Sequence, residues 1–430
     1  MTRSLMKAGF DIDDTLAFRS AAEIRREQER LLNRHLEYCR RNSPFYKNIP
    51  ERQFTLESLS ELPTTSKSDL ALRNAEFLAV DESCLSDICF TSGTTGRPCR
   101  VAYTRSDLNR LAANDACGFL AAGMRSDDVI LTTCTLDRCF IAGMAYYSGV
   151  VQRGAAAIRN GLNTIESHAE IFRSTRVTGI VGVPSFLAKL GAKLAADGID
   201  TSSVRCVVCI GEPLRTRSME LTALGRKLES FWPGAVHSTY ASTEIATSFT
   251  ECSARSGGHA PAELAVVEIV DAQGRPLPPG ETGEVCVTPL GVEGMPLVRF
   301  LTGDISFIVP EPCSCGRNTP RLGPILGRKA QMLKVRGTTL FPSVIFNALD
   351  GCGMVEDYYL EVTGSELSDE VGVFAHLRDG CEPAAVAEAI YAKTRIHVRV
   401  TGTASEKVRA KVFGVSRKPV RFFDCRKAVQ

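Results

Sequence analysis

The segment from Thr91 to Arg97 has the residue types of an anion-binding loop. Glycine lets the backbone approach an oxyanion closely, and hydroxyl and backbone N–H groups can then donate hydrogen bonds to it. A Walker loop is excluded, because the glycines are three residues apart and no Lys-Ser or Lys-Thr pair follows them. Pro98 disfavours a helix here, so we expect a phosphate-binding turn between two strands, with a plain hydrophilic hairpin turn as the alternative. The loop consists of Thr91, Ser92, Gly93, Thr94, Thr95, Gly96 and Arg97.

Four side chains with soft donor atoms form a second candidate site: Cys252, His259, Cys313 and Cys315. Three thiolates and an imidazole suit a tetrahedral Zn²⁺ ion. The spacings, six residues between Cys252 and His259 and one between the later cysteines, are not those of common zinc fingers, so free thiols are the alternative. A metal here would have a structural role, because it would join two pairs of ligands that lie roughly sixty residues apart.

Further motifs follow the loop in a fixed order along the chain. They are Gly211-Glu212-Pro213, Tyr240-Ala241-Ser242-Thr243-Glu244, the run from Leu297 to Asp304, and Gly327-Arg328 with the run from Met332 to Pro342. Together with the loop at 91–97, this order resembles the adenylate-forming enzymes, which include acyl-CoA synthetases, luciferases and peptide-synthetase adenylation domains. The resemblance covers nearly the whole chain, and five motifs in the right order are a strong signal where one would be weak.

Two additional segments narrow the resemblance to the phenylacetate–CoA ligase branch. The first is Cys313-Ser314-Cys315-Gly316-Arg317, just before the expected hinge. The second is an N-terminal helical pattern from Leu31 to Tyr46 that is followed by the run from Leu62 to Leu70. Some members of this branch place zinc ligands at the positions of the four soft donors, so the resemblance favours zinc over free thiols.

The resemblance implies how the nucleoside part of ATP is bound. The turn Gly211-Glu212-Pro213 would lie beside the adenine, and Tyr240 would stack on it. Asp304 would accept hydrogen bonds from both ribose hydroxyls, and Arg328 would make a second ribose contact. Each of these residues alone would be assigned a structural role, but the ordered set favours a nucleotide site.

The phosphate end of the site is also implied by the resemblance. The loop at 91–97 would hold the β- and γ-phosphates, with Arg97 in place of the more usual lysine as a forked cation. Ser242 and Thr243 belong to the motif from Tyr240 to Glu244, in which Thr243 would contact the α-phosphate. Glu244 would bind Mg²⁺, an ion that prefers hard carboxylate ligands.

The catalytic lysine implied by the resemblance is Lys418. The order of Lys418, Arg421, Asp424 and Arg426 keeps the spacing of the branch, although the flanking glycine and alanine are lost. Such a lysine would act as the cation on the substrate carboxylate and the α-phosphate, and a solvated basic tail is the alternative.

The hinge departs from the pattern of the family. Ala330 and Gln331 stand where an acidic residue is usual, Leu301 replaces an arginine, and Ala241 replaces a glycine. The nucleotide-binding half of the chain keeps its motifs and is expected to be intact. The switch from adenylation to thioester formation, which the hinge controls, is the step that these replacements put in doubt.

The alternation of short β-rich and helical runs predicts an α/β fold. Between residues 85 and 215, apolar runs at 129–133, 179–183 and 204–210 read as strands, and those at 165–174 and 186–197 read as helices, which indicates βαβ units around a mainly parallel sheet. Residues 262–309 predict a β subdomain. After the hinge, strands at 358–362, 371–377 and 396–400 with a helix at 384–393 predict a small α+β domain. We expect a large domain at 1–327, which binds ATP and the acid, and a small mobile domain at 328–430, which carries Lys418.

Composition limits the possible partners and the compartment. The chain has 430 residues with 51 Lys and Arg against 49 Asp and Glu, a net charge of +2 that favours neither nucleic acid nor an anionic membrane. The 16 cysteines are scattered through apolar runs, as expected for reduced, buried thiols. No run reaches the ~20 apolar residues of a membrane span, and the N-terminus lacks the pattern of a signal peptide. We therefore expect a cytoplasmic protein, and a homodimer is left open.

The sequence thus predicts an AMP-forming ligase with ATP, Mg²⁺ and coenzyme A as cofactors and a structural Zn²⁺. It would convert an aromatic or arylacetic acid to an acyl-adenylate and transfer the acyl group to coenzyme A. One alternative keeps adenylation and changes the acceptor to a carrier-protein thiol or an amine. Another is a non-catalytic homologue that binds a nucleotide or an aryl acid as a sensor or scaffold.

Overall fold

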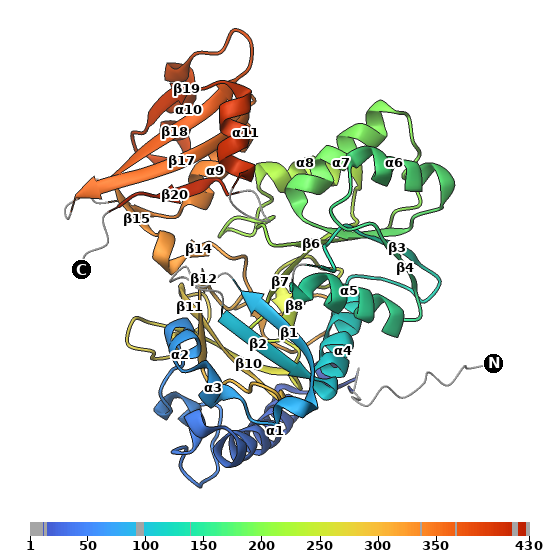
Figure 1. Ribbon diagram of the computed structural model, residues 1–430, viewed down its shortest axis with the longest axis vertical. Helices are drawn as coiled ribbons and strands as arrows, with labels where there is room; N and C mark the ends of the chain where they lie inside the picture. Colours follow the sequence, from blue (N-terminus) through green and yellow to red (C-terminus); the bar gives the residue numbers. More distant parts are fainter. Residues whose placement is uncertain are drawn as a thin grey trace. The chain divides into compact units, whose positions relative to one another are not determined.

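The computed structural model of the protein describes residues 12, 15–91, 99–137, 139–335, 338–365, 368–414 and 420–426. The chain forms two compact units. The first contains the residues up to Glu220 and Gly225–Ile325, and the second contains Leu221–Leu224 and the chain from Leu326 onward. Figure 1 colours the chain from blue at the N-terminus to red at the C-terminus. No helix in the described part of the chain has the length and hydropathy that a bilayer span requires.

An eight-stranded sheet forms the centre of the first unit. The five strands from β4 to β7 run parallel, and β8, β9 and β13 continue the sheet in antiparallel pairing. The chain reverses direction after β7 at a turn in which Ala246 has φ of +46°. In spatial order the strands are β4 (Ala156–Arg159), β3 (Val129–Thr132), β5 (Gly179–Gly182), β6 (Cys206–Ile210), β7 (Val236–Ser242), β8 (Thr247–Glu251), β9 (Gly258–His259) and β13 (Arg321–Leu322).

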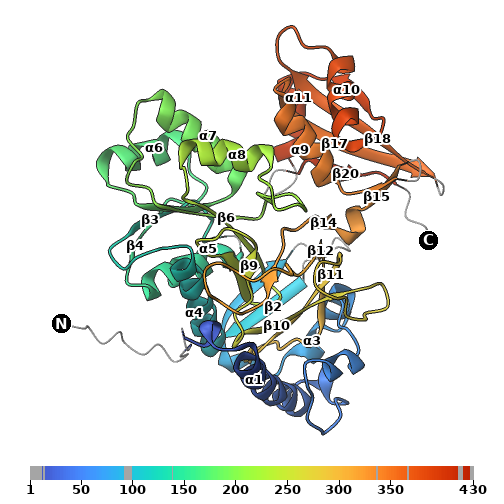
Figure 2. The same cartoon turned by 180° about the vertical axis from the view of Figure 1, so that it is seen from behind.

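Helices cover both faces of this sheet. Helices α6, α7 and α8 lie over one face of the parallel strands, and α4 and α5 lie over the other (Figures 1 and 2). Helix α4 approaches β8 very closely at Gly118, where a Cβ atom would lie 2.6 Å from Thr250 Oγ1. The helices are α4 (Arg105–Ala121), α5 (Ile141–Gln152), α6 (Ile165–Ser174), α7 (Pro184–Ala196) and α8 (Ala223–Phe231).

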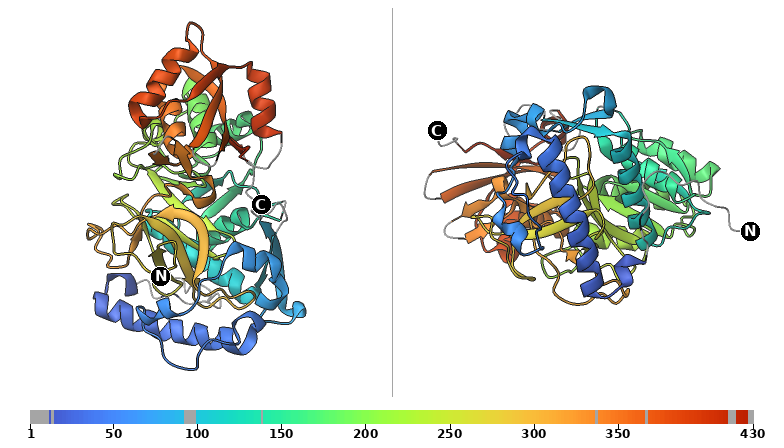
Figure 3. Two further views of the ribbon diagram at one scale, coloured as in Figure 1. Left: turned by 90° about the vertical axis from the view of Figure 1, so that its left-hand side faces the viewer. Right: turned by 90° about the horizontal axis from the view of Figure 1, so that it is seen from below.

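The first unit also contains an antiparallel β subdomain of β10 (Ala265–Val270), β11 (Gly283–Pro289) and β12 (Phe300–Ser306). Helix α1 (Ala21–Asn42) runs as one long helix along this part of the unit (Figure 3), and its Leu32 and Leu36 share a hydrophobic core with Val285 and Val287 of β11. The remaining elements are β1 (Leu85–Thr91), β2 (Cys99–Thr104), α2 (Lys67–Leu72), α3 (Asn74–Phe77) and the 3₁₀ turns η1 (Leu16–Phe18), η2 (Pro44–Tyr46), η3 (Ser58–Glu61) and η4 (Glu82–Cys84).

The second unit is a separate α+β structure with its own core. Its four-stranded sheet has the order β19-β18-β17-β20, in which β17 and β18 form an antiparallel hairpin and the outer strands pair in parallel. The elements are β14 (Gly327–Arg328), η5 (Lys329–Gln331), β15 (Leu333–Val335), β16 (Thr338–Leu340), α9 (Pro342–Cys352), β17 (Val355–Ser365), β18 (Ser368–Leu377), α10 (Pro383–Thr394), β19 (Arg399–Gly402), α11 (Ser405–Phe413) and β20 (Phe422–Asp424).

The structure confirms the predicted α/β class. The strands and helices expected between 129 and 210 are present, with ends that differ by a few residues. The strand expected at 396–400 is displaced and begins only at Arg399. The reason is that α10 ends with Arg395 in a left-handed conformation, φ of +60°, and the side chain of Ile396 turns into the core.

Candidate active site and metal centre

Tyr240 and Asp304 lie next to each other although their positions differ by 64 in the chain. Tyr240 is on β7, Asp304 is on β12, and the tyrosine hydroxyl donates a hydrogen bond of 2.8 Å to Asp304 Oδ2. The tyrosine ring stacks on Phe249 at a centroid distance of 6.0 Å, and burial raises the pKa of its hydroxyl. The two residues predicted to bind adenine and ribose are thus brought together by strands of two different sheets.

The turn after β7 holds Thr243 and Glu244 in buried positions. Tyr103 Oη donates a hydrogen bond of 2.6 Å to the carbonyl oxygen of Thr243. The Glu244 carboxylate lies 3.6 Å from the ammonium group of Lys67, the first residue of α2. Ser242 Oγ is buried and has no hydrogen-bond partner within the described residues. The sequence carried no signal that joined Lys67 to Glu244, because 176 positions lie between them.

The turn at Gly211 to Pro213 is anchored through its acidic side chain. Gly211 has φ of +78°, a conformation that glycine adopts without strain. The Glu212 carboxylate accepts hydrogen bonds from Ser185 N at 2.8 Å and Ser185 Oγ at 2.9 Å, at the N-terminus of α7. This interaction is favourable, because the free N–H groups and the dipole at a helix start stabilise a carboxylate. Glu212 therefore holds the turn against α7.

Two parts of the predicted site lie outside the described residues. They are Lys418 and most of the loop, namely Ser92, Gly93, Thr94, Thr95, Gly96 and Arg97. Thr91 is the last residue of β1 and pairs with Cys99, the first residue of β2, in an antiparallel ladder. The strands on both sides of the loop are therefore arranged as the sequence predicted.

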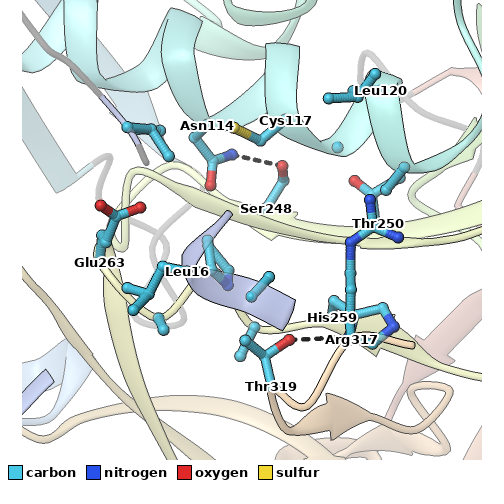
Figure 4. Close-up of a pocket in the computed structure, with 17 residues that line it drawn as sticks. Leu16, Asn114, Cys117, Leu120, Ser248, Thr250, His259, Glu263, Arg317 and Thr319 are labelled. Atoms are coloured by element: carbon cyan, nitrogen blue, oxygen red, sulfur yellow. Dashed lines mark hydrogen bonds between the residues drawn. The ribbon is translucent and has the colours of Figure 1, made fainter. Parts of the chain in front are cut away.

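The four soft donors meet in the first unit. Their donor atoms all lie within 4.8 Å of one another. Cys252 Sγ is 3.6 Å from Cys313 Sγ, and Cys315 Sγ is 3.4 Å from His259 Nε2. His259 Nδ1 is 2.9 Å from Thr319 Oγ1 (Figure 4), and this contact orients the other ring nitrogen toward Cys315. We call these four residues the Cys₃His cluster.

Comparison with known proteins places this chain in a family. The profile of AMP-binding enzymes matches residues 36–293. Phenylacetate-coenzyme A ligase of Thermus thermophilus is 30% identical over 358 residues, which are 80% of this chain and 79% of that enzyme. The chain belongs to the AMP-binding enzyme family. Within it, the chain is an AMP-forming acid–CoA ligase of the phenylacetate–CoA ligase-like branch.

A second relative and a solved structure extend the comparison. Phenylacetate-coenzyme A ligase of Escherichia coli K12 is 27% identical to this ligase over 388 residues, 85% of each chain. The crystal structure of 2-hydroxyisobutyryl-CoA ligase with 2-HIB-AMP, in the postadenylation state, matches with a TM-score of 0.83. The match covers 97% of this chain and 94% of that one at 20% identity, so it establishes the shared fold.

In the second unit of the ligase, Arg426 binds the segment in which the usual hinge acid is missing. Its guanidinium donates to the carbonyl oxygens of Ala330 at 3.3 Å and Met332 at 3.0 Å. It also forms ion pairs with Asp369 and Asp424. Arg328, the predicted ribose contact, is exposed on β14. The basic motif near the C-terminus is therefore partly a structural clamp on its own unit.

Burial and hydrogen bonding shift the pKa values within the Cys₃His cluster in opposite directions. Burial raises the pKa of Cys252 to about 12 and lowers the pKa of His259 to about 4. Burial also acts to raise the pKa of Cys315, but hydrogen bonds from Arg317 and neighbouring thiols lower it to about 7. At neutral pH the imidazole is neutral, as a metal ligand must be.

A small cavity lies beside the cluster and apart from the nucleotide residues. Its volume is about 80 Å³, and Figure 4 shows His259 and Thr319 at one side and α4 at the other. Asn114 on α4 donates a hydrogen bond of 2.6 Å to Ser248 Oγ on β8 at its edge. Among the described residues that line the cavity, none belongs to the predicted nucleotide site.

Proposed function

We propose that this ligase activates an aromatic or arylacetic carboxylic acid with ATP and transfers the acyl group to coenzyme A. The observation that carries the nucleotide part is the convergence of Tyr240, Asp304, Thr243 and Glu244 around the end of β7. The choice of acid rests on the relatives, four of which are phenylacetate-coenzyme A ligases that align with 76% to 86% of this chain.

The nucleoside would be held by groups that are already ordered. The Asp304 carboxylate can accept hydrogen bonds from both ribose hydroxyls, and the Tyr240 ring offers a flat surface for adenine. A carboxylate suits a sugar diol because its oxygens are acceptors only and bind two donors side by side. Groups that are ordered before binding reduce the entropy lost when the ligand binds. We therefore expect the nucleoside part of ATP to bind first and the phosphates to be aligned afterwards.

At the phosphate end, the residues fit a magnesium ion that arrives with ATP. Glu244 is a hard oxygen ligand, and its buried charge is balanced in the structure by Lys67. Bound Mg²⁺ would neutralise charge on the phosphate oxygens. Thr243 would donate to the α-phosphate, and the loop at 91–97 would hold the leaving pyrophosphate. Lys418, from the domain proposed for residues 328–430, would orient the attacking carboxylate and stabilise the charge that develops at the α-phosphate.

The Cys₃His cluster fits a structural Zn²⁺ ion. Ligands at zinc–sulfur distances of 2.3 Å in a tetrahedron lie about 3.8 Å apart, close to the 3.6 Å between the sulfur atoms of Cys252 and Cys313. The hydrogen bond between His259 and Thr319 fixes the imidazole as second-shell partners of zinc ligands do. Such an ion would join the loop after β8 to the segment before β13, and it would take no part in the chemistry.

Exchange of labelled pyrophosphate into ATP, measured with a panel of aryl and arylacetic acids, tests the proposal. We expect exchange that depends on one class of acid, and thioester formation when coenzyme A is added. Lys418→Ala should lose exchange, with Lys407→Ala on α11 as a control that removes a different lysine of the same unit. Exchange without thioester would show a different acceptor, and no exchange with any acid would contradict the ligase activity on aryl acids.

A further inference from the structure

Arg110, in the second turn of α4, has a completely buried side chain. Its guanidinium donates to the carbonyl oxygens of Ala246 at 2.5 Å and Leu290 at 2.7 Å, to that of Leu264, and to Thr247 Oγ1 at 3.1 Å. These acceptors are all neutral. Burial lowers the pKa of Arg110 to about 10, which reflects the cost of placing a charge away from water. The hydrogen bonds to the carbonyl groups and the nearby charge of Asp107 offset this cost, so the arginine and the segments around it stabilise one another.

One of these segments is the turn that carries Thr243 and Glu244. Ala246 closes this turn in a left-handed conformation, φ of +46°, which is unfavourable for a residue with a Cβ atom. Arg110 binds Ala246 O and Thr247 Oγ1, and Thr247 Oγ1 in turn donates to Ile245 O at 2.9 Å. Arg110 of α4 therefore fixes the C-terminal end of the strained turn, at Ala246 and Thr247, by hydrogen bonds.

The N-terminal end of the same turn, at Thr243, accepts a hydrogen bond from a residue of β2. Tyr103 is 1% exposed, and its hydroxyl donates to the carbonyl oxygen of Thr243. Both donors are buried and bind the backbone and Thr247 Oγ1 of the turn, and the Glu244 carboxylate is paired with Lys67. The sequence assigned no role to either donor, because Arg110 lies in a mixed polar and apolar helical segment and neither residue belongs to a motif with a recognisable spacing.

We propose that Arg110, supported by Tyr103, is a positioning residue that sets the backbone of the turn for binding of Mg·ATP. This inference rests on the proposed nucleotide site. A displacement of about 1 Å in a positioned group can cost two orders of magnitude in rate, and the turn carries both the predicted α-phosphate contact and the predicted magnesium ligand. Loss of Arg110 would therefore weaken binding of the metal–phosphate part of ATP and spare the nucleoside part, which Tyr240 and Asp304 hold on their own strands.

A matched pair of substitutions separates this role from a general effect on stability. Arg110→Lys keeps the charge and removes the fork of donors. Arg321→Lys is the control, because Arg321 is also buried, at 4% exposed, and donates to neutral carbonyl oxygens, but these belong to Ser256 and Glu311, outside the turn. Both variants are expected to lower the melting temperature. Tyr103→Phe is a third variant, which removes one hydrogen bond of the turn with little change in volume.

The measurement is calorimetric titration of each full-length variant with Mg·ATP and, separately, with adenosine in the absence of magnesium, well below the melting temperature. For Arg110→Lys we expect the Kd of Mg·ATP to rise roughly tenfold or more, and for Tyr103→Phe a smaller rise in the same direction. The adenosine affinity of both turn variants, and both affinities of Arg321→Lys, should stay within about twofold of wild type. A folded Arg110→Lys protein with wild-type Mg·ATP affinity overturns the inference, as does an equal loss of adenosine affinity.

If Arg110→Lys does not fold, Tyr103→Phe decides the question, and unchanged Mg·ATP affinity in that variant overturns the inference. A wild-type protein that binds no Mg·ATP would instead contradict the proposed function. The two failures are distinguishable, because one appears in the variants alone and the other in the unmodified protein.

Discussion

The nucleotide end of the site and the Cys₃His cluster lie at opposite ends of β8, and they satisfy their polar groups differently. At the nucleotide end, Asp304 accepts from Tyr240 and Glu244 faces Lys67, so each acid has a partner without any ligand. In the cluster, thiols and an imidazole face one another. Thiols and an imidazole attract one another only weakly. A bound cation would make their close approach favourable, because each could donate an electron pair to it. Under the proposed function, the first region has its polar groups paired before the nucleotide binds, and the second would be completed by a metal ion.

The largest effect is expected at the nucleotide end. Glu244→Gln keeps the shape of the side chain but removes the charge that would bind magnesium, so pyrophosphate exchange should fall by about 10² to 10³-fold. The measurement is exchange at saturating magnesium, with Glu220→Gln as a control outside the site. Near-normal exchange in Glu244→Gln would place the magnesium ligand elsewhere.

Loss of one cluster ligand should mainly affect stability. Cys313→Ser should abolish binding of about one equivalent of zinc and lower the melting temperature by several degrees, because zinc binding to a preformed site stabilises the folded chain. Metal analysis and thermal unfolding check this, with Cys84→Ser, an exposed thiol outside the cluster, as the control. Below the melting temperature, exchange should change far less than in Glu244→Gln. A purified wild type with no zinc and full stability would refute the metal assignment.

Lys67 tests whether the ion pair matters to the nucleotide end. Lys67→Met leaves the buried Glu244 carboxylate without the cation beside it and removes positive charge near the expected phosphates. We expect exchange to fall by about tenfold, measured as kcat and KM for Mg·ATP at several salt concentrations. Lys47→Met, on the same unit, is the control. Wild-type kinetics in Lys67→Met would show that the ion pair does not contribute to pyrophosphate exchange.

The smallest effect concerns β8, which joins the two regions. Asp115 on α4 binds Ser248 Oγ of this strand at 2.7 Å, and burial raises its pKa to about 7. Between pH 4 and 7 the folded state keeps a proton on Asp115 that the unfolded state releases, so stability should fall as pH rises. The limiting slope is about 1.4 kcal/mol per pH unit.

Asp115→Asn cannot ionise, so its stability should depend less on pH in this range. Urea unfolding at pH 4.5, 5.5 and 6.5 checks the difference between variant and wild type, and Asp127→Asn, an exposed acid, is the control. Parallel curves for wild type and Asp115→Asn would show that the carboxyl group is ionised in the folded protein.

Much of the fold was predictable because its signals are local. The buried strand Cys206–Ile210 is a continuous apolar run, and helix α6 at Ile165–Ser174 has apolar residues on one face. The displaced strand near residue 399 shows the limit of this reasoning, because Ile396 has strand-like composition but serves the core after a left-handed helix end. The identity of the predicted nucleotide and metal residues also came from short motifs, whose order is a property of the sequence.

What the sequence determined by itself is therefore the family and the α/β class, together with a set of candidate residues for the chemistry. The tertiary structure decided which of them meet. Tyr240 reaches Asp304 across two sheets, Lys67 faces Glu244, and Arg110 holds the turn behind them. These contacts join residues far apart in the chain, and they depend on how strands and helices pack. Local propensity and spacing carry no record of that packing, because a hydrogen bond between distant segments forms only once the whole core has assembled.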